Sequence, residues 1–134
     1  MEPQHQQDLW AIALENYQAA GLTAQQGWHN VSVACSYYAV FTAMWVTLGD
    51  PPKGYWEHRG ISKPFALGHW RTPASSVARP IVTAIRVLYE DRLRADYRGV
   101  RLTNQESETG LLTGRRVLRL VADACSLSHE GSLS

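Results

Sequence analysis

The sequence predicts an all-α protein, an up-and-down bundle of about five helices. Residues 30–49 carry no charged side chain, and their apolar residues recur every three or four positions, which is the spacing of a helix. Glycine and proline divide the rest of the chain into further stretches with this helical period. The links between most stretches are short and polar, which favours antiparallel neighbours. A chain of 134 residues forms one domain, which we place at residues 5–127, followed by a flexible tail over residues 128–134.

The first helix is expected over residues 5–24, with Gly21 and Gly27 available to end it. One face of this helix carries apolar residues: Leu9, Ile12, Ala13, Tyr17 and Ala20. Asn30 then follows as the expected N-cap of the central helix, because an asparagine side chain can accept from the first free backbone amides.

The central helix is expected to pack through one main apolar row, formed by Val31, Ala34, Tyr38, Phe41, Trp45 and Leu48. A second apolar row runs beside it and contains Val33, Tyr37, Val40 and Met44. A narrow polar side is expected at Asn30, Ser32, Ser36, Thr42 and Thr47. Apolar residues around most of the circumference predict that this helix lies at the centre of the bundle.

A membrane span is the alternative interpretation of residues 30–49, because an uncharged stretch of this length can cross a bilayer. The polar side of the helix and the lack of a basic cluster on either flank favour a buried helix over this alternative. We therefore expect no membrane association. The N-terminus has neither the basic nor the apolar region of a secretion signal, so a cytoplasmic location is expected.

Residues 49–73 contain four glycines and four prolines, which break any long regular element. A link of this length is either functional or contains short helices. Its large aromatic residues Trp56, Phe65 and Trp70 are expected to cap the open end of the bundle, since aromatic residues usually anchor loops. The alternative is that they form a ligand-binding surface.

Two further helices are expected after this link. Thr72-Pro73 and Arg79-Pro80 each resemble the start of a helix, and from Pro80 the helical period continues to about Arg98, where Gly99 ends it. Residues 103–106 have the form of a capping box, and a last amphipathic helix follows to about residue 126.

Charge and cysteine content exclude few functions. The formal net charge is +1, but nine of the eleven arginines fall within residues 79–119, where the net charge is +4 against −3 elsewhere. This bias suits a surface that faces phosphate, and it suits a solvated helix face equally well. The two cysteines, Cys35 and Cys125, lie in separate apolar helical patterns and are expected to be buried free thiols.

The sequence lacks the motifs of several common catalytic and metal-binding sites. The five histidines show no HxxxH or HExxH spacing and the cysteines no CxxC spacing, so neither a metal site nor a metal cofactor is expected. No glycine-rich phosphate loop is present, which argues against nucleotide hydrolysis by a P-loop. No G-x-S-x-G elbow is present to support Ser-His-Asp catalysis. On the later helix, Arg92 and Asp96 are spaced to form an i, i+4 salt bridge, either as an exposed pair or at a bundle or dimer interface.

Three segments together resemble the HEPN superfamily, specifically its small stand-alone proteins. They are SVACSYYAVFTAM in the central helix, EHRGISKPF in the following link and RLRADY in the later helix. The family pattern has an AYYAMF-type helix, an SHKGV-like segment ending at a phenylalanine, and R-x-x-A-D-Y. The resemblance covers roughly residues 8–127 and rests on the order and spacing of these segments, because each motif alone is weakly specific.

The resemblance implies an all-α bundle that pairs as a homodimer. HEPN proteins occur in toxin-antitoxin, phage-defence and CRISPR-linked systems, often as metal-independent endoribonucleases, and they are frequently encoded beside a small nucleotidyltransferase. A nucleotidyltransferase-type partner protein or a larger effector complex is therefore the expected partner. In the nuclease members an arginine is followed, after four to six residues, by a histidine. The arginine holds the phosphate and the histidine transfers the proton.

This sequence departs from the nuclease pattern. Four residues separate Arg92 from Tyr97, not from a histidine, and no arginine in the chain has a histidine at the required distance. Tyrosine titrates near about pH 10 and is a poor proton acceptor at neutral pH. We therefore expect a regulatory module that binds RNA, a nucleotide or a partner protein, in which Arg92, Asp96 and Tyr97 line a dimer groove. The resemblance places Tyr37, Tyr38 and His58 nearby.

Two alternatives remain from the sequence. The first is an endoribonuclease toxin in which Arg92 binds the scissile phosphate and His58 or His69 moves the proton. The second is a structural subunit of a larger complex, whose tryptophan-rich link over residues 49–73 docks on a partner.

Overall fold

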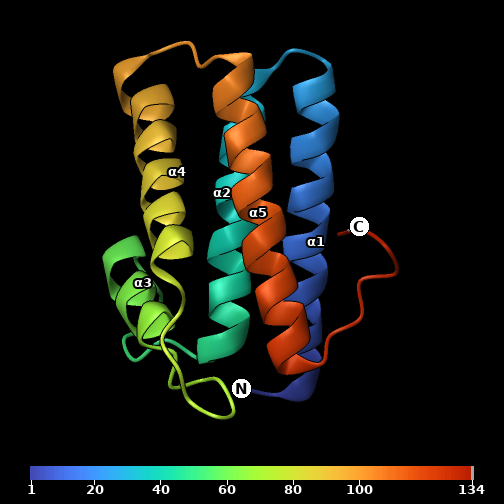
Figure 1. The fold of residues 1–134 in the computed structure, drawn as a ribbon, viewed down its shortest axis with the longest axis vertical. Coiled ribbons are helices and arrows are strands. Elements are labelled where there is room, and N and C mark those ends of the chain that lie inside the picture. The colour runs from blue at the N-terminus through green and yellow to red at the C-terminus, as the bar shows by residue number, and fades with distance from the viewer. Residues whose placement is uncertain (134) are drawn as a thin grey trace.

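The computed structural model describes residues 1–133, which form five helices and no strand. The helices are α1 (Pro3–Gln25), α2 (His29–Leu48), α3 (His58–Leu67), α4 (Arg79–Arg98) and α5 (Asn104–Cys125). Figure 1 shows α1, α2, α4 and α5 packed along one another, each running opposite to the long helix before it in the chain, while the short α3 lies at one end of the bundle next to α4. The predicted all-α, up-and-down bundle of about five helices is therefore confirmed.

Helix α2 lies at the centre and contacts each of the other four helices. By length and hydropathy it could cross a membrane, but 56% of its most apolar window is buried against its neighbours, as in the core helix of a bundle. The second apolar row identified in the sequence is the one that faces the core: Val33, Tyr37, Val40 and Met44 are at most 3% exposed.

The expected main row of α2 was assigned to the wrong face. Val31 and Tyr38 are 48% and 44% exposed, whereas Ser32 and Ser36 of the supposed polar side are fully buried. Ser32 donates to the backbone carbonyl of Ala20 in α1 at 2.8 Å. A Cβ added at Gly110 of α5 would lie 3.6 Å from the Ser36 side chain. Small residues of α2 therefore lie where it packs against α1 and α5, because close helix packing needs small side chains.

Helix α1 covers α2 with a face that differs in part from the predicted one. Leu9, Ala13 and Ala20 are buried as expected, but Ile12 is 45% exposed and Trp10 is buried instead. The Trp10 indole nitrogen donates to the Ser128 carbonyl at 2.8 Å. The segment that was expected to be a flexible tail thus runs back beside α1 over residues 128–133, with Leu133 only 1% exposed.

Asn30 does not cap α2, because Trp28 occupies the N-cap position. The Asn30 side-chain amide donates to the Val100 carbonyl at 2.9 Å, and the Leu102 backbone amide donates to Asn30 Oδ1 at 2.8 Å. This pair of bonds joins the start of α2 to the link between α4 and α5. The expected cap is therefore wrong, and the side chain is used for a tertiary contact.

The link after α2 contains α3, and Thr72-Pro73 starts no helix. Phe65 is 1% exposed and stacks on Trp70, with ring centroids 5.1 Å apart. The Trp56 indole donates to the Gly49 carbonyl at 3.0 Å. Gly68 ends α3 with a φ of +74°, and a side chain there would collide with the Ser75 backbone. These contacts fix α3 and the link against the end of the bundle.

Helices α4 and α5 begin and end close to the predicted residues. Gly99 ends α4 in the left-handed conformation, and the capping box is formed by Thr103 and Glu106 at the start of α5. Arg94 of α4 pairs with Asp91 at 3.1 Å and with Glu106 at 2.7 Å. Arg94, one of the nine arginines within residues 79–119, thus joins α4 to α5.

Candidate functional site

An open cleft of about 510 Å³ lies where α2, α4 and the start of α3 meet. We call it the tyrosine cleft. Its lining comprises Tyr37, Tyr38, Phe41, Trp56, Glu57, His58, Arg59, Tyr89 and Arg92. Each of the three segments that carry the HEPN resemblance contributes to it, although these segments lie far apart in the sequence.

The helices place the charged and aromatic groups of the cleft in defined positions. Tyr37 and Tyr38 are consecutive on α2, so their side chains leave the helix in different directions: Tyr37 is 3% exposed and Tyr38 44%. Tyr89 and Arg92 are three residues apart on α4 and therefore share a face. His58 is the first residue of α3. The short helix α3 thus places the imidazole of His58 beside the surface that α2 and α4 form.

The guanidinium of Arg92 lies close to two tyrosine rings. Its Cζ is 4.9 Å from the ring centroid of Tyr37 and 4.9 Å from that of Tyr38. Nη2 donates to the Tyr38 hydroxyl at 2.9 Å, and Nε lies 3.2 Å from Asp96 Oδ2. The side chain is 18% exposed. Cation–π contact and the carboxylate of Asp96 hold this cation in one orientation at the cleft wall.

Tyr37 connects Arg92 to His58. Its hydroxyl and His58 Nδ1 are 3.1 Å apart in a hydrogen bond whose direction depends on the imidazole tautomer. Burial raises the pKa of Tyr37 to about 12, against the opposing effect of the Arg92 charge, so its phenol stays protonated at neutral pH.

His58 is a neutral imidazole at neutral pH. Burial lowers its pKa, and the positive charges of Arg59 and Arg92 lower it further. A neutral imidazole has one donor nitrogen and one acceptor nitrogen. The cleft therefore combines a fixed cation, a neutral proton acceptor and several aromatic faces.

Tyr89 is a cleft residue that the sequence reasoning missed. Its ring lies flat on the imidazole of His58, with centroids 3.6 Å apart and planes at 1°. It also contacts Tyr37, with centroids 5.5 Å apart. The available signal was its position three residues before Arg92, which puts both on one face of a helix.

The predicted site residues are only partly brought together. Arg92, Tyr37, Tyr38 and His58 line the cleft, and Asp96 reaches it through its ion pair with Arg92. Tyr97 is 74% exposed and is not part of the cleft lining. Five residues of helix turn a side chain by about 140° relative to Arg92, so the two cannot share a surface. His69, the other histidine considered as a proton carrier, is also absent from this lining.

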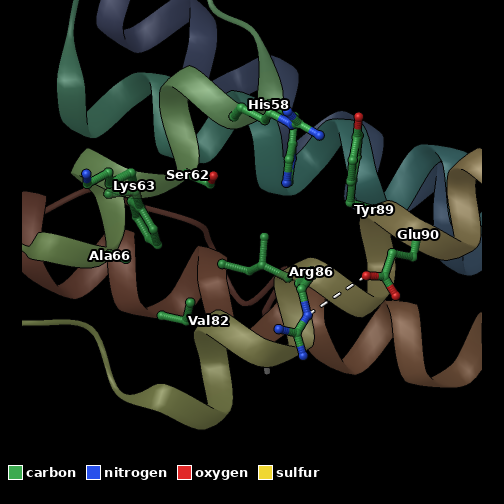
Figure 2. Close-up of a pocket in the computed structure, with 11 residues that line it drawn as sticks. His58, Ser62, Lys63, Ala66, Val82, Arg86, Tyr89 and Glu90 are labelled. Atoms are coloured by element: carbon green, nitrogen blue, oxygen red, sulfur yellow. Dashed lines mark ion pairs between the residues drawn. The ribbon is translucent and has the colours of Figure 1, made fainter.

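A second cleft of about 460 Å³ lies between α3 and α4. We call it the α3–α4 cleft. It shares His58, Arg59 and Tyr89 with the tyrosine cleft. Figure 2 shows Ser62 and Lys63 on one side of this cleft, Val82 and Arg86 across from them, and the rings of His58 and Tyr89 next to each other at its end.

Within residues 1–133, no group of three or more histidine, cysteine, aspartate or glutamate side chains is placed to hold a metal ion. Both cysteines are free thiols and half-buried, and burial raises the pKa of each. In comparisons with known proteins, no family model, no curated protein and no solved structure matches this chain.

Proposed function

We propose that this protein is a HEPN-like module that binds single-stranded RNA or a nucleotide in the tyrosine cleft. The observation that carries the proposal is the position of Arg92, whose guanidinium lies beside two tyrosine rings in an open cleft. A guanidinium fork matches the oxygens of a phosphate, and aromatic faces stack on bases. Arg59, an exposed residue of the same lining, adds a second positive charge.

The meeting of three sequence segments in one cleft supports the HEPN part of the proposal. Tyr37 and Tyr38 come from the first segment, His58 from the second and Arg92 from the third. As a HEPN-like protein it would act in a defence or toxin-antitoxin type system, paired with a second copy of itself and with a nucleotidyltransferase-type protein or an effector complex.

Fluorescence anisotropy with a labelled, short single-stranded RNA tests the binding proposal. Affinity should fall steeply between about 50 mM and about 200 mM salt, because phosphate contacts release counterions. Arg92→Gln should weaken binding about tenfold, since a charge-assisted contact is lost. Arg98→Gln removes the same charge from an exposed position outside the cleft lining and should have little effect. Equal affinities for both variants and the unchanged protein would contradict the proposal.

A metal-independent endoribonuclease is the second candidate function. It is favoured by one observation, the neutral His58 bonded to the same tyrosine that contacts Arg92. His58 would take the proton of the ribose 2′-hydroxyl as this oxygen attacks phosphorus, and Arg92 would stabilise the added charge while the bond to the 5′-oxygen breaks.

Incubation of labelled RNA in EDTA distinguishes the two candidates. Cleavage that is lost in both Arg92→Gln and His58→Gln would support the enzyme. Binding without cleavage in the unchanged protein would leave the binding module as the function.

A further inference from the structure

We infer that the two clefts take consecutive nucleotides of one single-stranded polynucleotide, so that the strand passes the stacked rings of His58 and Tyr89. This inference deepens the proposed function and rests on it. It identifies the ligand as an oligomer and not as a single nucleotide, and it gives the α3–α4 cleft a role in binding.

The two clefts lie next to each other. His58, Arg59 and Tyr89 line both of them, so a ring pair whose centroids are 3.6 Å apart is their common wall. Each cleft has a volume within the usual range of ligand sites, about 300–1,000 Å³. Exposed Arg59 borders both clefts, where a phosphate that connects two nucleotides would pass.

The charge of the second cleft suits a polyanion. Its lining has three cations, Arg59, Lys63 and Arg86, and one carboxylate, Glu90. Glu90 pairs with Arg86 at 3.9 Å, and both side chains are more than 60% exposed. This leaves Arg59 and Lys63 without a balancing carboxylate in the lining. A chain with a phosphate at every step would meet a positive group in each cleft.

The floor of the second cleft is apolar. Phe65 and Ile85 are 1% and 4% exposed, and half-buried Ala66 and Val82 lie beside them. The accessible part of this floor is half-buried Ala66 and Val82, against which the face of a base can lie, while Ser62 at the side supplies a hydroxyl. Basic groups along a groove with apolar and aromatic surfaces between them are the usual pattern for single-stranded nucleic acid.

Competition binding with uridine oligomers of increasing length tests the inference. Uridine monophosphate, the dinucleotide and the tetranucleotide each compete with a labelled tetranucleotide for the full chain. The dinucleotide should bind at least about tenfold tighter than the monophosphate, because a second base and phosphate are held. Lys63→Glu should weaken the dinucleotide and tetranucleotide about tenfold and leave the monophosphate unchanged, since Lys63 lines only the second cleft.

Lys53→Glu is the matched control, because it makes the same charge change at an exposed lysine outside both clefts. Equal affinity for the monophosphate and the tetranucleotide would overturn the inference. So would a Lys63→Glu variant that behaves like Lys53→Glu. If Arg92→Gln still weakens binding in those cases, the proposed function stands and only the second subsite is lost. If the unchanged protein binds no uridine compound of any length, the proposed function fails and the inference fails with it.

Discussion

The imidazole of His58 lies flat against the phenol ring of Tyr89, with ring centroids 3.6 Å apart and planes at 1°. His58 starts α3, and Tyr89 lies in the middle of α4. The stack therefore attaches a short helix to a long one at the point where two clefts meet. It places the neutral imidazole within reach of Tyr37, and both rings belong to the lining of each cleft.

Loss of the Tyr89 ring should loosen this attachment. Tyr89→Ala is expected to lower the free energy of unfolding by at least about 2 kcal/mol, because the ring contacts both His58 and Tyr37. Tyr89→Phe keeps the ring and should cost less than about 0.5 kcal/mol. Urea unfolding followed by circular dichroism measures both. Similar losses for the two variants would show that the hydroxyl, and not the stack, stabilises this region.

The lowered pKa of His58 predicts a pH dependence of stability. Below about pH 6.5 the unfolded chain binds a proton at this histidine that the folded protein resists, so stability should fall as pH drops. Above that pH the group should have no effect. Between about pH 7.5 and about pH 5.5, the unchanged protein should therefore lose more unfolding free energy than His58→Gln. The other four histidines are common to both proteins and cancel in the comparison. An equal or smaller loss in the unchanged protein would mean that His58 is not held neutral.

The two hydrogen bonds of Asn30, at the start of α2, predict that losing this side chain lowers the stability of the protein. Asn30→Ala should lower the unfolding free energy by about 2 kcal/mol, since the Val100 carbonyl and the Leu102 amide both lose their partner. Asn16→Ala removes a single bond to the Ile12 carbonyl of the same helix and should change stability by less than about 0.5 kcal/mol. Thermal or urea unfolding compares the two. An Asn30→Ala variant as stable as Asn16→Ala would refute the tertiary role of Asn30.

The close contacts around Gly110 predict that a larger residue there would be too large for the space between α5 and its neighbouring helices. A Cβ there would lie 3.2 Å from Leu88 Cδ1 and 3.6 Å from the Ser36 side chain. Gly110→Val should lower the unfolding free energy by about 1–3 kcal/mol through overpacking. The same substitution at Gly21 of α1, where no atom lies within 4 Å, should stay within about 0.5 kcal/mol of the unchanged protein. Two equally stable variants would show that α5 can move away from α2 without cost.

The fold could be predicted because its signals are local. The helical period, the proline that starts α4, the glycine after α4 and the capping box of α5 each act within a few residues. Only part of the buried face of α2 could be predicted in this way. Periodicity favoured the row with the largest side chains, but Ser32 and Ser36 face the core because helix contact there requires small residues.

The motifs predicted the site only in part. Tyr37, Tyr38, His58 and Arg92 were identified by their place in the three segments, and all four line one cleft. Tyr97 belongs to the same R-x-x-A-D-Y segment as Arg92, yet five helical residues turn it away from the cleft. The contact of His58 with Tyr89 joins residues 31 positions apart on two helices, so no local pattern encodes it.

The central claim is that a single-stranded ligand binds where Arg92 meets the tyrosine rings. Titration of the isotope-labelled protein with a short single-stranded RNA, followed by amide nuclear magnetic resonance shifts, tests it most directly. The largest shifts should appear at Tyr37, Tyr38, His58 and Arg92. Shifts concentrated instead on the arginines of α5, Arg115, Arg116 and Arg119, or no shifts at all, would contradict the claim.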